Sequence, residues 1–510
     1  MQESRVKKSL LNARVNTICY FLSLFVAFFT RKIFIDYLGT EFIGLTGTLQ
    51  SLLGFLNLAE LGIGSAIGYF LYKPLVAKDE IRLRELVSLL GYVYRIIGLV
   101  ILSAGVVLAL FLPLIYPDLQ FSLSVVYVGY FAYLFSTLIG YFCNYKMSLL
   151  GADQKNYIIT GYFQLTTTIK VILQMLLAVY YTNFIIYFVV EFGFGIVNSL
   201  ILNYKIRQTY PWLETDLANG RLLFKQNPDI WRKVRDLFFH KIATFVQYQI
   251  MPFLIYGYVS LPMVALYTNY TIITQKIQGL VGGILGSTGS GVGSLIAEGD
   301  KDKIYNTFKE LFFLCYFVAF IVSSAVYYLV ADFIALWLGA EYILSDVVAF
   351  LICLNFFLSL SRMCVDQFIF GHGLFHDIWA PLVESLIFVV ASVVFGSIYG
   401  LPGVLAGPII SLFLIVFIWK SYFLYSRGFH LPCYNFWILF FSHISIFIVS
   451  YFLTSKLLDI FDISISLQWL SWIVDASIFV VLESVICLLL LVPFSSGLRI
   501  FVQRILIRLK

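Results

Sequence analysis

Long apolar runs separated by short polar segments form the main pattern along the chain. We count about fourteen such runs, each long enough to cross about 30 Å of hydrocarbon as a helix that rises about 1.5 Å per residue. Because every backbone polar group in lipid must find a partner within the protein, runs of this length predict helices rather than barrel strands. The predicted spans cover approximately residues 14–36, 42–70, 86–113, 122–145, 157–180, 184–204, 237–257, 263–292, 310–336, 346–370, 378–398, 403–420, 436–455 and 469–493.

The pattern therefore predicts an all-α polytopic membrane protein with about fourteen transmembrane helices. Of the 510 residues, 61% are hydrophobic and only 12% are charged, whereas a soluble chain carries roughly 25% charged residues. The mean hydropathy is +0.92. This composition excludes a soluble enzyme, a disordered scaffold and a nucleic-acid-binding protein, and it makes the lipid bilayer the first expected partner.

Lysine and arginine residues are distributed unevenly between the two sides of the predicted membrane. Nearly all loop cations lie on the side of the N-terminus, and Lys456 is the one cation in the opposite loops. Cytoplasmic loops are the ones enriched in Lys and Arg. We therefore expect both termini to be cytoplasmic, together with the longest connection, residues 205–236.

Two stretches of the chain resemble each other at a fixed offset. Residues 37–45 and 258–266 open similar helices, both of which end in glycine-rich sequence and then a polar exit, Lys78-Asp79 or Gly299-Asp300. Three matches in register argue for a duplicated six-helix unit, an arrangement typical of secondary transporters. We expect an N-terminal lobe at 1–204 (helices 1–6), a cytoplasmic linker at 205–236, a C-terminal lobe at 237–425 (helices 7–12), and helices 13–14 with a basic tail at 426–510.

Motifs for catalysis are missing. The sequence holds no GxxxxGK[ST] phosphate loop, no GxSxG elbow and no HExxH pair. The seven cysteines form no CxxC pair, and His372 and His376 have no Cys or Glu nearby. The outward loops are too short to hold the catalytic groups of a glycan polymerase. We therefore expect no enzyme, no catalytic residues, no cofactor and no metal site.

Charged residues inside the predicted spans carry the candidate chemistry. A charge at the centre of a membrane helix costs roughly 3 kcal/mol, so most of these side chains must face protein or water rather than lipid. One structural explanation is close at hand, because Arg362 and Asp366 are four residues apart on one helix and can neutralise each other. The seven cations within spans are Arg31, Lys32, Arg95, Lys170, Lys241, Lys276 and Arg362.

Small and polar residues recur at helical spacing beside several of these charges. Ordinary packing and interhelical hydrogen bonds explain the glycines of these stripes well. A hydrated cavity shared by several helices explains the polar members together, and its excess of cations would suit an anionic cargo. On this argument we expect Lys170, Lys276 and Arg362 to bind substrate, with the polar stripe residues Gln50, Asn57, Gln275 and Gln278.

Residues 31–75, RKIFIDYLGTEFIGLTGTLQSLLGFLNLAELGIGSAIGYFLYKPL, resemble the N-terminal helices of Wzx-type flippases, which export O-antigen and capsule units. The superfamily also holds multidrug extruders and peptidoglycan-precursor flippases. The resemblance is close over 31–100 and looser beyond. It implies alternating access in the bacterial plasma (inner) membrane, with a polyprenyl-pyrophosphate-linked oligosaccharide as cargo and a glycan polymerase and other assembly proteins as possible partners. It also makes Arg31 a candidate phosphate-binding residue.

The means of coupling and the cargo stay open at this point. The membrane potential can drive an anion outward, and ion antiport through Glu60 or Asp366 is the other option. Three alternative functions are a small-molecule cation antiporter of the same fold, a flippase for the peptidoglycan lipid precursor, and a membrane glycosyltransferase. A cation extruder would favour an acidic cavity, and a glycosyltransferase would need larger outward loops.

Overall fold

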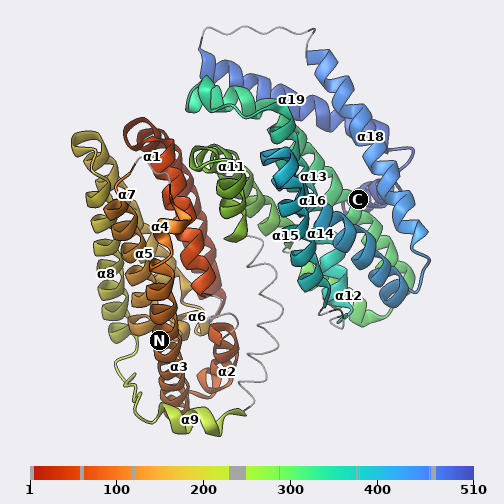
Figure 1. Ribbon diagram of the computed structural model, residues 1–510. Coiled ribbons are helices and arrows are strands. Elements are labelled where there is room, and N and C mark those ends of the chain that lie inside the picture. The colour runs from red at the N-terminus through yellow and green to blue at the C-terminus, as the bar shows by residue number, and fades with distance from the viewer. Residues whose placement is uncertain are drawn as a thin grey trace. The chain divides into compact units, whose positions relative to one another are not determined.

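The computed structural model describes residues 5–57, 63–117, 121–228, 249–286, 288–374, 377, 379–458, 460 and 467–509. Within these ranges the chain is all-helical and holds no strand (Figure 1). The first helices are α1 (Arg5–Leu56), α2 (Ile63–Ala77), α3 (Glu80–Ala109), α4 (Leu112–Ile115), α5 (Leu123–Cys143), α6 (Met147–Ala152), α7 (Asn156–Tyr181), α8 (Phe184–Thr209) and α9 (Gly220–Gln226). The later ones are α11 (Leu261–Gly286), α12 (Gly289–Glu298), α13 (Lys301–Trp337), η2 (Ala340–Tyr342), α14 (Asp346–Gly371), α15 (Trp379–Tyr399), α16 (Leu401–Ser411), η3 (Leu412–Lys420), α17 (Ser421–Phe423), η4 (Leu424–Phe429), α18 (Tyr434–Leu458), α19 (Gln468–Leu491) and α20 (Ser496–Leu509).

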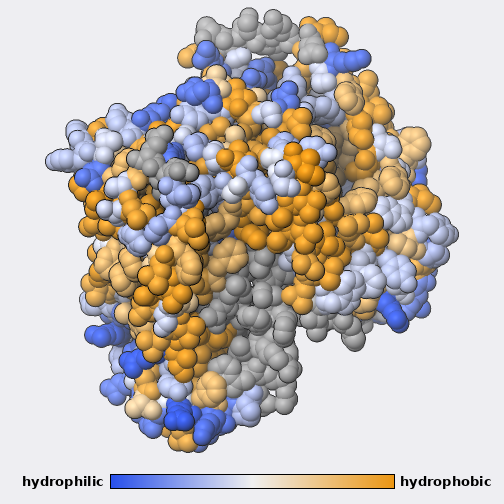
Figure 2. Space-filling view, in the orientation of Figure 1, coloured by the Kyte–Doolittle hydropathy of each residue, from blue (hydrophilic) through white to orange (hydrophobic). Residues whose placement is uncertain are grey.

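Eleven helices in the described ranges are long and apolar enough to cross a membrane. The predicted spans 14–36 and 42–70 are joined in α1, where Gly39 (φ 83°, ψ 159°) forms a kink rather than a loop. Most of the predicted span 237–257 lies outside the described residues. The polar helix α11 is not among the eleven. Hydrophobic residues cover long stretches of the outer helices, while hydrophilic residues gather at helix ends, for example near α9 (Figure 2).

The chain packs as two compact units. Unit 1 comprises Met1–Tyr256 with Ser260–Ala265, and unit 2 comprises Gly257–Val259 with Leu266–Lys510. The change from one unit to the other thus falls at residues 257–265, next to the start of α11. The lobe boundaries expected from the sequence, with a linker at 205–236, stay a prediction.

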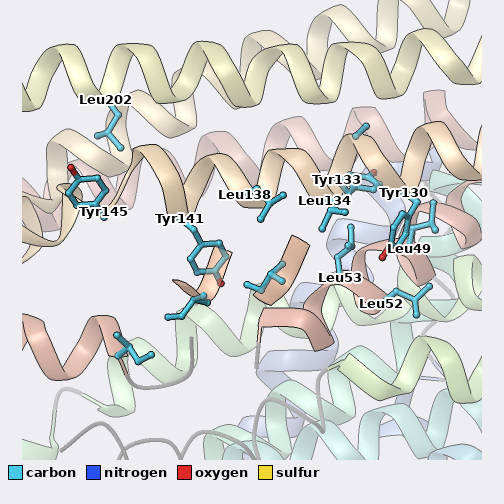
Figure 3. Close-up of a cluster of buried hydrophobic side chains, with 14 of the residues drawn as sticks. Leu49, Leu52, Leu53, Tyr130, Tyr133, Leu134, Leu138, Tyr141, Tyr145 and Leu202 are labelled. Atoms are coloured by element: carbon cyan, nitrogen blue, oxygen red, sulfur yellow. The ribbon is translucent and has the colours of Figure 1, made fainter. Parts of the chain in front are cut away.

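Unit 1 has its own hydrophobic core. Its buried leucines and tyrosines come from α1, α3, α5 and α8, and Figure 3 shows part of this cluster around α5. Leu49 and Leu53 of α1 and Leu134 of α5 are at most 3% exposed. The buried Tyr130 hydroxyl donates a hydrogen bond to the Gly105 carbonyl of α3 at 2.8 Å. Burial of a large apolar side chain stabilises the fold by about 1.5–3 kcal/mol, so this cluster holds α1, α3 and α5 together.

Unit 2 is built around the long helix α13 and is rich in aromatic residues. Phe308, Phe312 and Tyr316 follow one face of α13 and are fully buried. Phe312 and Tyr316 stack with ring centroids 3.9 Å apart, and Phe308 contacts Phe368 of α14 edge to face at 5.1 Å. Such aromatic pairs add about 0.5–1.5 kcal/mol beyond their burial. The C-terminal helix α20 covers this helix as well, because Gly497 lies directly against the Lys309 carbonyl.

Helices α15 and α16 approach each other through glycines. A Cβ atom at Gly403 would overlap the Phe395 carbonyl, and one at Gly407 would overlap Ser392 and the Phe388 carbonyl. The Ser392 hydroxyl donates to the Val404 carbonyl at 2.9 Å. Small residues four apart are a known means of bringing membrane helices into close backbone contact. Gly403 and Gly407 therefore fix the spacing of this hairpin.

The predicted internal match is visible in the local backbone. Lys78 (φ 57°) and Gly299 (φ 82°) both adopt the left-handed conformation. Each is followed by an aspartate, Asp79 or Asp300, that caps the next helix by accepting a hydrogen bond from the backbone amide three residues later, at 2.9 and 3.0 Å. The same residue offset relates the break at Gly39 to the one at Ser260. The two stretches thus share this local backbone pattern, and the duplicated six-helix unit stays a prediction.

Candidate functional site

The predicted site residues fall on helices of both units. Gln50 and Arg31 lie on α1, Lys170 on α7, Lys276 with Gln275 and Gln278 on α11, and Arg362 with Asp366 on α14. Asn57 directly follows the end of α1. Glu60 and Lys241 lie outside the described residues.

An ion pair inside unit 1 joins the neighbouring helices α7 and α8. The Lys170 ammonium lies 2.6 Å from the Glu191 carboxylate, and less than a fifth of either side chain is exposed. The other oxygen of Glu191 accepts a hydrogen bond from the Gln174 amide at 3.1 Å, and the same amide donates to the Tyr187 carbonyl at 3.2 Å. Lys170 and Gln174 are four residues apart on α7, so both reach one carboxylate from the same helix face.

Arg31 joins this group from α1. Its guanidinium donates to the Ala265 carbonyl at 2.7 Å. It also interacts electrostatically with the Tyr187 hydroxyl, which in turn interacts with Glu191. The Tyr187 phenol thus interacts with both the cation of α1 and the carboxylate of α8. We call Arg31, Lys170, Gln174, Tyr187 and Glu191 the unit 1 polar cluster.

A phenol and an amide extend the unit 1 polar cluster. The buried Tyr133 hydroxyl of α5 lies beside the side chains of Gln50 and Tyr187. Within the described part of the chain this hydroxyl has no hydrogen bond of good geometry. The structure thus brings three predicted residues, Arg31, Gln50 and Lys170, into one connected group of guanidinium, ammonium, amide and phenol donors. Donors of these kinds bind phosphate and sugar hydroxyl groups.

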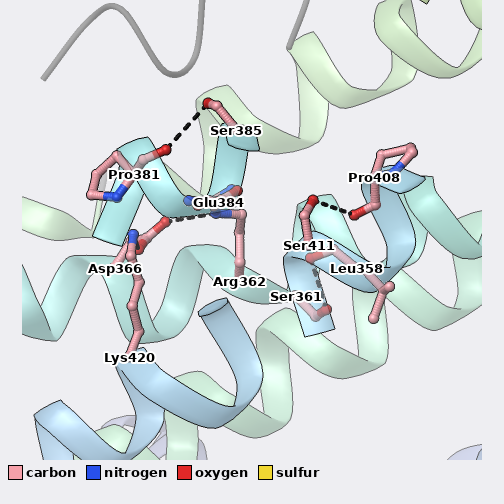
Figure 4. A network of polar contacts seen from close by, with 10 residues as sticks. All are labelled: Leu358, Ser361, Arg362, Asp366, Pro381, Glu384, Ser385, Pro408, Ser411 and Lys420. Atoms are coloured by element: carbon pink, nitrogen blue, oxygen red, sulfur yellow. Dashed lines mark hydrogen bonds and ion pairs between the residues drawn. The ribbon is translucent and has the colours of Figure 1, made fainter. Parts of the chain in front are cut away.

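A second cluster lies in unit 2 and links α14, α15 and η3 (Figure 4). Arg362 pairs with Asp366 at 3.0 Å, as their spacing suggested, and also with Glu384 of α15 at 3.2 Å. Lys420, the last residue of η3, pairs with the other oxygen of Asp366 at 2.9 Å. Two cations and two carboxylates alternate, so each ion has an opposite charge beside it. We call these four residues the unit 2 ion cluster.

These contacts change the charge balance on which the sequence argument depended. Lys170 and Arg362 do not act as uncompensated cations, because each lies against a carboxylate. A bound anion at either position has to share the cation with Glu191, Asp366 or Glu384. The excess of positive charge that would favour an anionic cargo is therefore smaller at these two positions than the sequence suggested.

The remaining predicted residues lie elsewhere. Asn57 accepts a hydrogen bond from the Tyr141 hydroxyl of α5 at 3.1 Å, a contact that packs α1 against α5. Gln275 is exposed on α11, and Lys276 and Gln278 are half-buried.

Sequence reasoning missed three charged members of these clusters as site residues, and also Gln174 and Tyr187. Glu191 and Glu384 were visible as acids within apolar spans, but no spacing within one helix links them to their partners on α7 and α14. Lys420 stood at the end of the predicted span 403–420 and counted as a loop cation. The helix continues past it to Phe429 through the π-helical segments η3 and η4, which places Lys420 inside the helical part of unit 2.

A hollow of about 360 Å³ in unit 2 offers a different environment. Aliphatic and aromatic side chains alone line it, and they come from α14, α16, η3 and α18, among them Leu354, Phe357, Ile409, Phe413, Phe440 and Ile444. Such a surface gives a charged or glycan group nothing to bind. Polar contacts with a cargo have to come from other parts of the chain.

No protein-family model matches the sequence, and no curated protein matches it. Solved structures do match the fold. A structure of the lipid II flippase MurJ in an inward closed conformation aligns with a TM-score of 0.64 and 14% identity, over 93% of this chain and 98% of that chain. An inward-facing structure of a multidrug resistance MATE family transporter of the MOP superfamily aligns with a TM-score of 0.60 and 14% identity, over 80% of this chain and 94% of that chain. At this identity the likeness shows a shared fold, the one these membrane transporters use.

Proposed function

We propose that the chain is a transporter that flips polyprenyl-pyrophosphate-linked oligosaccharide units from the cytoplasmic to the outer leaflet of the bacterial plasma membrane. The cargo would serve the synthesis of a surface polysaccharide such as O-antigen or capsule. The fold shared with a lipid flippase and a multidrug transporter supports a transport role rather than an enzymatic one. The likeness of residues 31–75 to Wzx-type flippases supports the narrower cargo.

The observation that carries the proposal is the position of Arg31 and Lys170 in the unit 1 polar cluster. Both cations lie within helices that are long and apolar enough to span a membrane. Lys170 contacts the Glu191 carboxylate from α7, and Arg31 of α1 interacts with the Tyr187 phenol, which itself interacts with Glu191. Guanidinium and ammonium groups are the usual protein ligands of phosphate. A diphosphate that enters unit 1 would therefore meet two cations at one place.

Glu191 competes with a bound diphosphate for Lys170. Because its carboxylate holds Lys170 at 2.6 Å, an arriving diphosphate has to take over that contact. Two anions in a poorly hydrated site repel each other strongly. We infer that cargo binding moves Lys170 away from Glu191, which makes this ion pair the part of unit 1 that responds to the cargo.

The glycan and the lipid tail call for different surfaces. The amide of Gln50 and the phenols of Tyr133 and Tyr187 suit sugar hydroxyl groups. The polyprenol can stay in the bilayer, where it needs no polar partner.

An outward movement of the anionic head group is favoured by about 2.3 kcal/mol per charge per 100 mV when the cell interior is negative. Ion antiport through Asp366 or Glu60 remains a second proposal for the coupling, and Asp366 is held by two cations in the unit 2 ion cluster.

The proposal is tested with purified protein in liposomes that contain a short polyprenyl-diphosphate disaccharide with a fluorescent sugar. An impermeant quencher reads the outer leaflet. Protein-free vesicles should protect the inner-leaflet pool, and vesicles with the protein should lose this protection over time. Arg31→Gln should slow flipping at least tenfold, equal to about 1.4 kcal/mol, and Arg31→Lys should be slowed less.

Lys32 supplies the matched control. It adjoins Arg31, but half of its side chain is exposed, and among the described residues its one ion pair is with Asp36 of the same helix, at 3.7 Å. Lys32→Gln should flip at the wild-type rate. Accumulation of a small cationic dye without lipid flipping would favour the antiporter alternative. Activity confined to lipids with a muropeptide would favour the peptidoglycan precursor, and either result would overturn the proposal.

A further inference from the structure

A carboxyl group that takes no part in either cluster is enclosed between the last long helices of unit 2. Glu483 of α19 has no exposed surface. One of its oxygens accepts a hydrogen bond from the Ser450 hydroxyl of α18 at 2.7 Å. The Thr454 hydroxyl, one helical turn farther along α18, lies beside it and is equally buried. Both helices are long and apolar enough to cross a membrane.

No positive charge contacts Glu483 within the described residues. Its titratable neighbours are the Cys487 thiol on α19 and the Tyr451 phenol on α18, and the latter interacts with Tyr327 and Tyr328 of α13. Thiols and phenols supply no cation. An ionised carboxylate at this place would have no exposed surface and no cation beside it among the described residues, and burial strongly disfavours such a charge.

Two buried polar atoms in this enclosure have no hydrogen bond of good geometry within the described residues. They are the second carboxyl oxygen of Glu483 and the hydroxyl oxygen of Thr454. The hydroxyl can donate or accept, so it can hydrogen-bond to this oxygen whether or not the oxygen carries a proton. The missing cation decides between the two forms, because a neutral carboxyl needs no counter-ion.

We propose that Glu483, with Ser450 and Thr454, forms a proton-binding site between α18 and α19. In the conformation described here the carboxyl is neutral, its first oxygen is the carbonyl bonded to Ser450, and its second oxygen carries the proton. When water reaches the space between these helices, the O–H bond breaks, the proton passes to water and a carboxylate remains. The site stands independently of the cargo that the protein carries.

Infrared spectroscopy of the purified protein in lipid at neutral pH tests this proposal. The wild-type spectrum minus that of Glu483→Gln should contain one carbonyl band of a protonated carboxylic acid, which shifts in D₂O. Ser450→Ala removes a hydrogen bond to the carbonyl oxygen and should move this band to higher frequency. Asp475→Asn, a less buried carboxyl on the same helix, should leave the band unchanged.

Two results would overturn the proposal. One is a difference spectrum with only carboxylate bands, which would make Glu483 an ion. The other is loss of the acid band when sodium replaces potassium at fixed pH, which would identify a cation site. If Glu483→Gln does not fold, the comparison of wild type with Ser450→Ala decides. An acid band at the same frequency in both proteins would mean that Glu483 is not the protonated carboxyl.

Discussion

Lys170 and Glu191 form a 2.6 Å ion pair between neighbouring helices of unit 1, and this pair joins α7 to α8 by opposite charges. Removal of one partner leaves a poorly solvated charge, which costs about 3–5 kcal/mol when the pair is buried. We expect Lys170→Gln and Glu191→Gln each to lower the thermal midpoint in detergent. The double variant should lose less than the sum, with a coupling energy above about 1 kcal/mol. Additive losses would mean that the two charges do not stabilise each other.

Lys420 should matter for stability although the sequence places it at a span end. It pairs with Asp366 at 2.9 Å, and only 13% of its side chain is exposed. In Lys420→Met the Asp366 carboxylate keeps Arg362 as its one cation in the unit 2 ion cluster, and Arg362 is shared with Glu384. We therefore expect the free energy of unfolding to fall by roughly 3 kcal/mol. Lys456→Met on α18, an exposed lysine, should change the free energy of unfolding by less than about 0.5 kcal/mol. Equal effects of the two substitutions on the thermal midpoint would contradict the importance of the unit 2 ion cluster.

Because α15 and α16 approach each other closely, a larger side chain in place of an interface glycine should destabilise the fold. A leucine at Gly407 has no room beside Ser392 and the Phe388 carbonyl, so Gly407→Leu should abolish folded monomer in size-exclusion chromatography. Gly193 of α8 has no atom near its missing Cβ. Gly193→Ala should therefore raise stability by about 0.5–1 kcal/mol, because alanine favours helices over glycine. A well-folded Gly407→Leu protein would show that the hairpin is looser than the backbone contacts indicate.

The left-handed residues before α3 and α13 predict opposite responses to glycine and alanine. Lys78 holds φ 57° at a steric cost that a glycine does not have. Lys78→Gly should raise the free energy of unfolding by up to about 1 kcal/mol, whereas Lys78→Ala should not. Gly299→Ala should lower it by a similar amount. The three thermal midpoints, measured side by side, check this order, and a gain from Lys78→Ala would contradict it.

The sequence predicted the helices well but missed several of their ends. Hydropathy marks the part of a helix that lipid can cover, so α13 was expected to start near residue 310, although its charged first turns begin at Lys301. The apolar run 42–70 covers the end of α1, at Leu56, and part of α2, which begins at Ile63, and residues 58–62 between them lie outside the described residues. The run 403–420 was expected to end at Lys420, whereas the helical chain continues to Phe429. Hydropathy does not show where a helix continues into polar sequence.

Some members of the two clusters stood out in the sequence, but most of their contacts did not. Intramembrane charges stood out at Arg31, Lys170, Arg362 and Asp366, because such charges are rare. Only the Arg362–Asp366 pair followed from spacing, since both residues lie on one helix. The partner of Lys170 is on another helix, and which helices adjoin is a property of the packed chain rather than of any local pattern.

The π-helical segments η3 and η4 give unit 2 a place where the helical register can change. A π-turn holds one residue more than an α-turn and often marks a functional position. If η3 tightened into an ordinary α-helix, with about 100° of rotation per residue, the end of η3 would turn around the helix axis relative to its start. Lys420 is the last residue of η3, so this rotation would carry its ammonium away from Asp366. The Lys420–Asp366 salt bridge therefore ties the end of η3 to α14 in the present helical register, and a change of register requires this salt bridge to break.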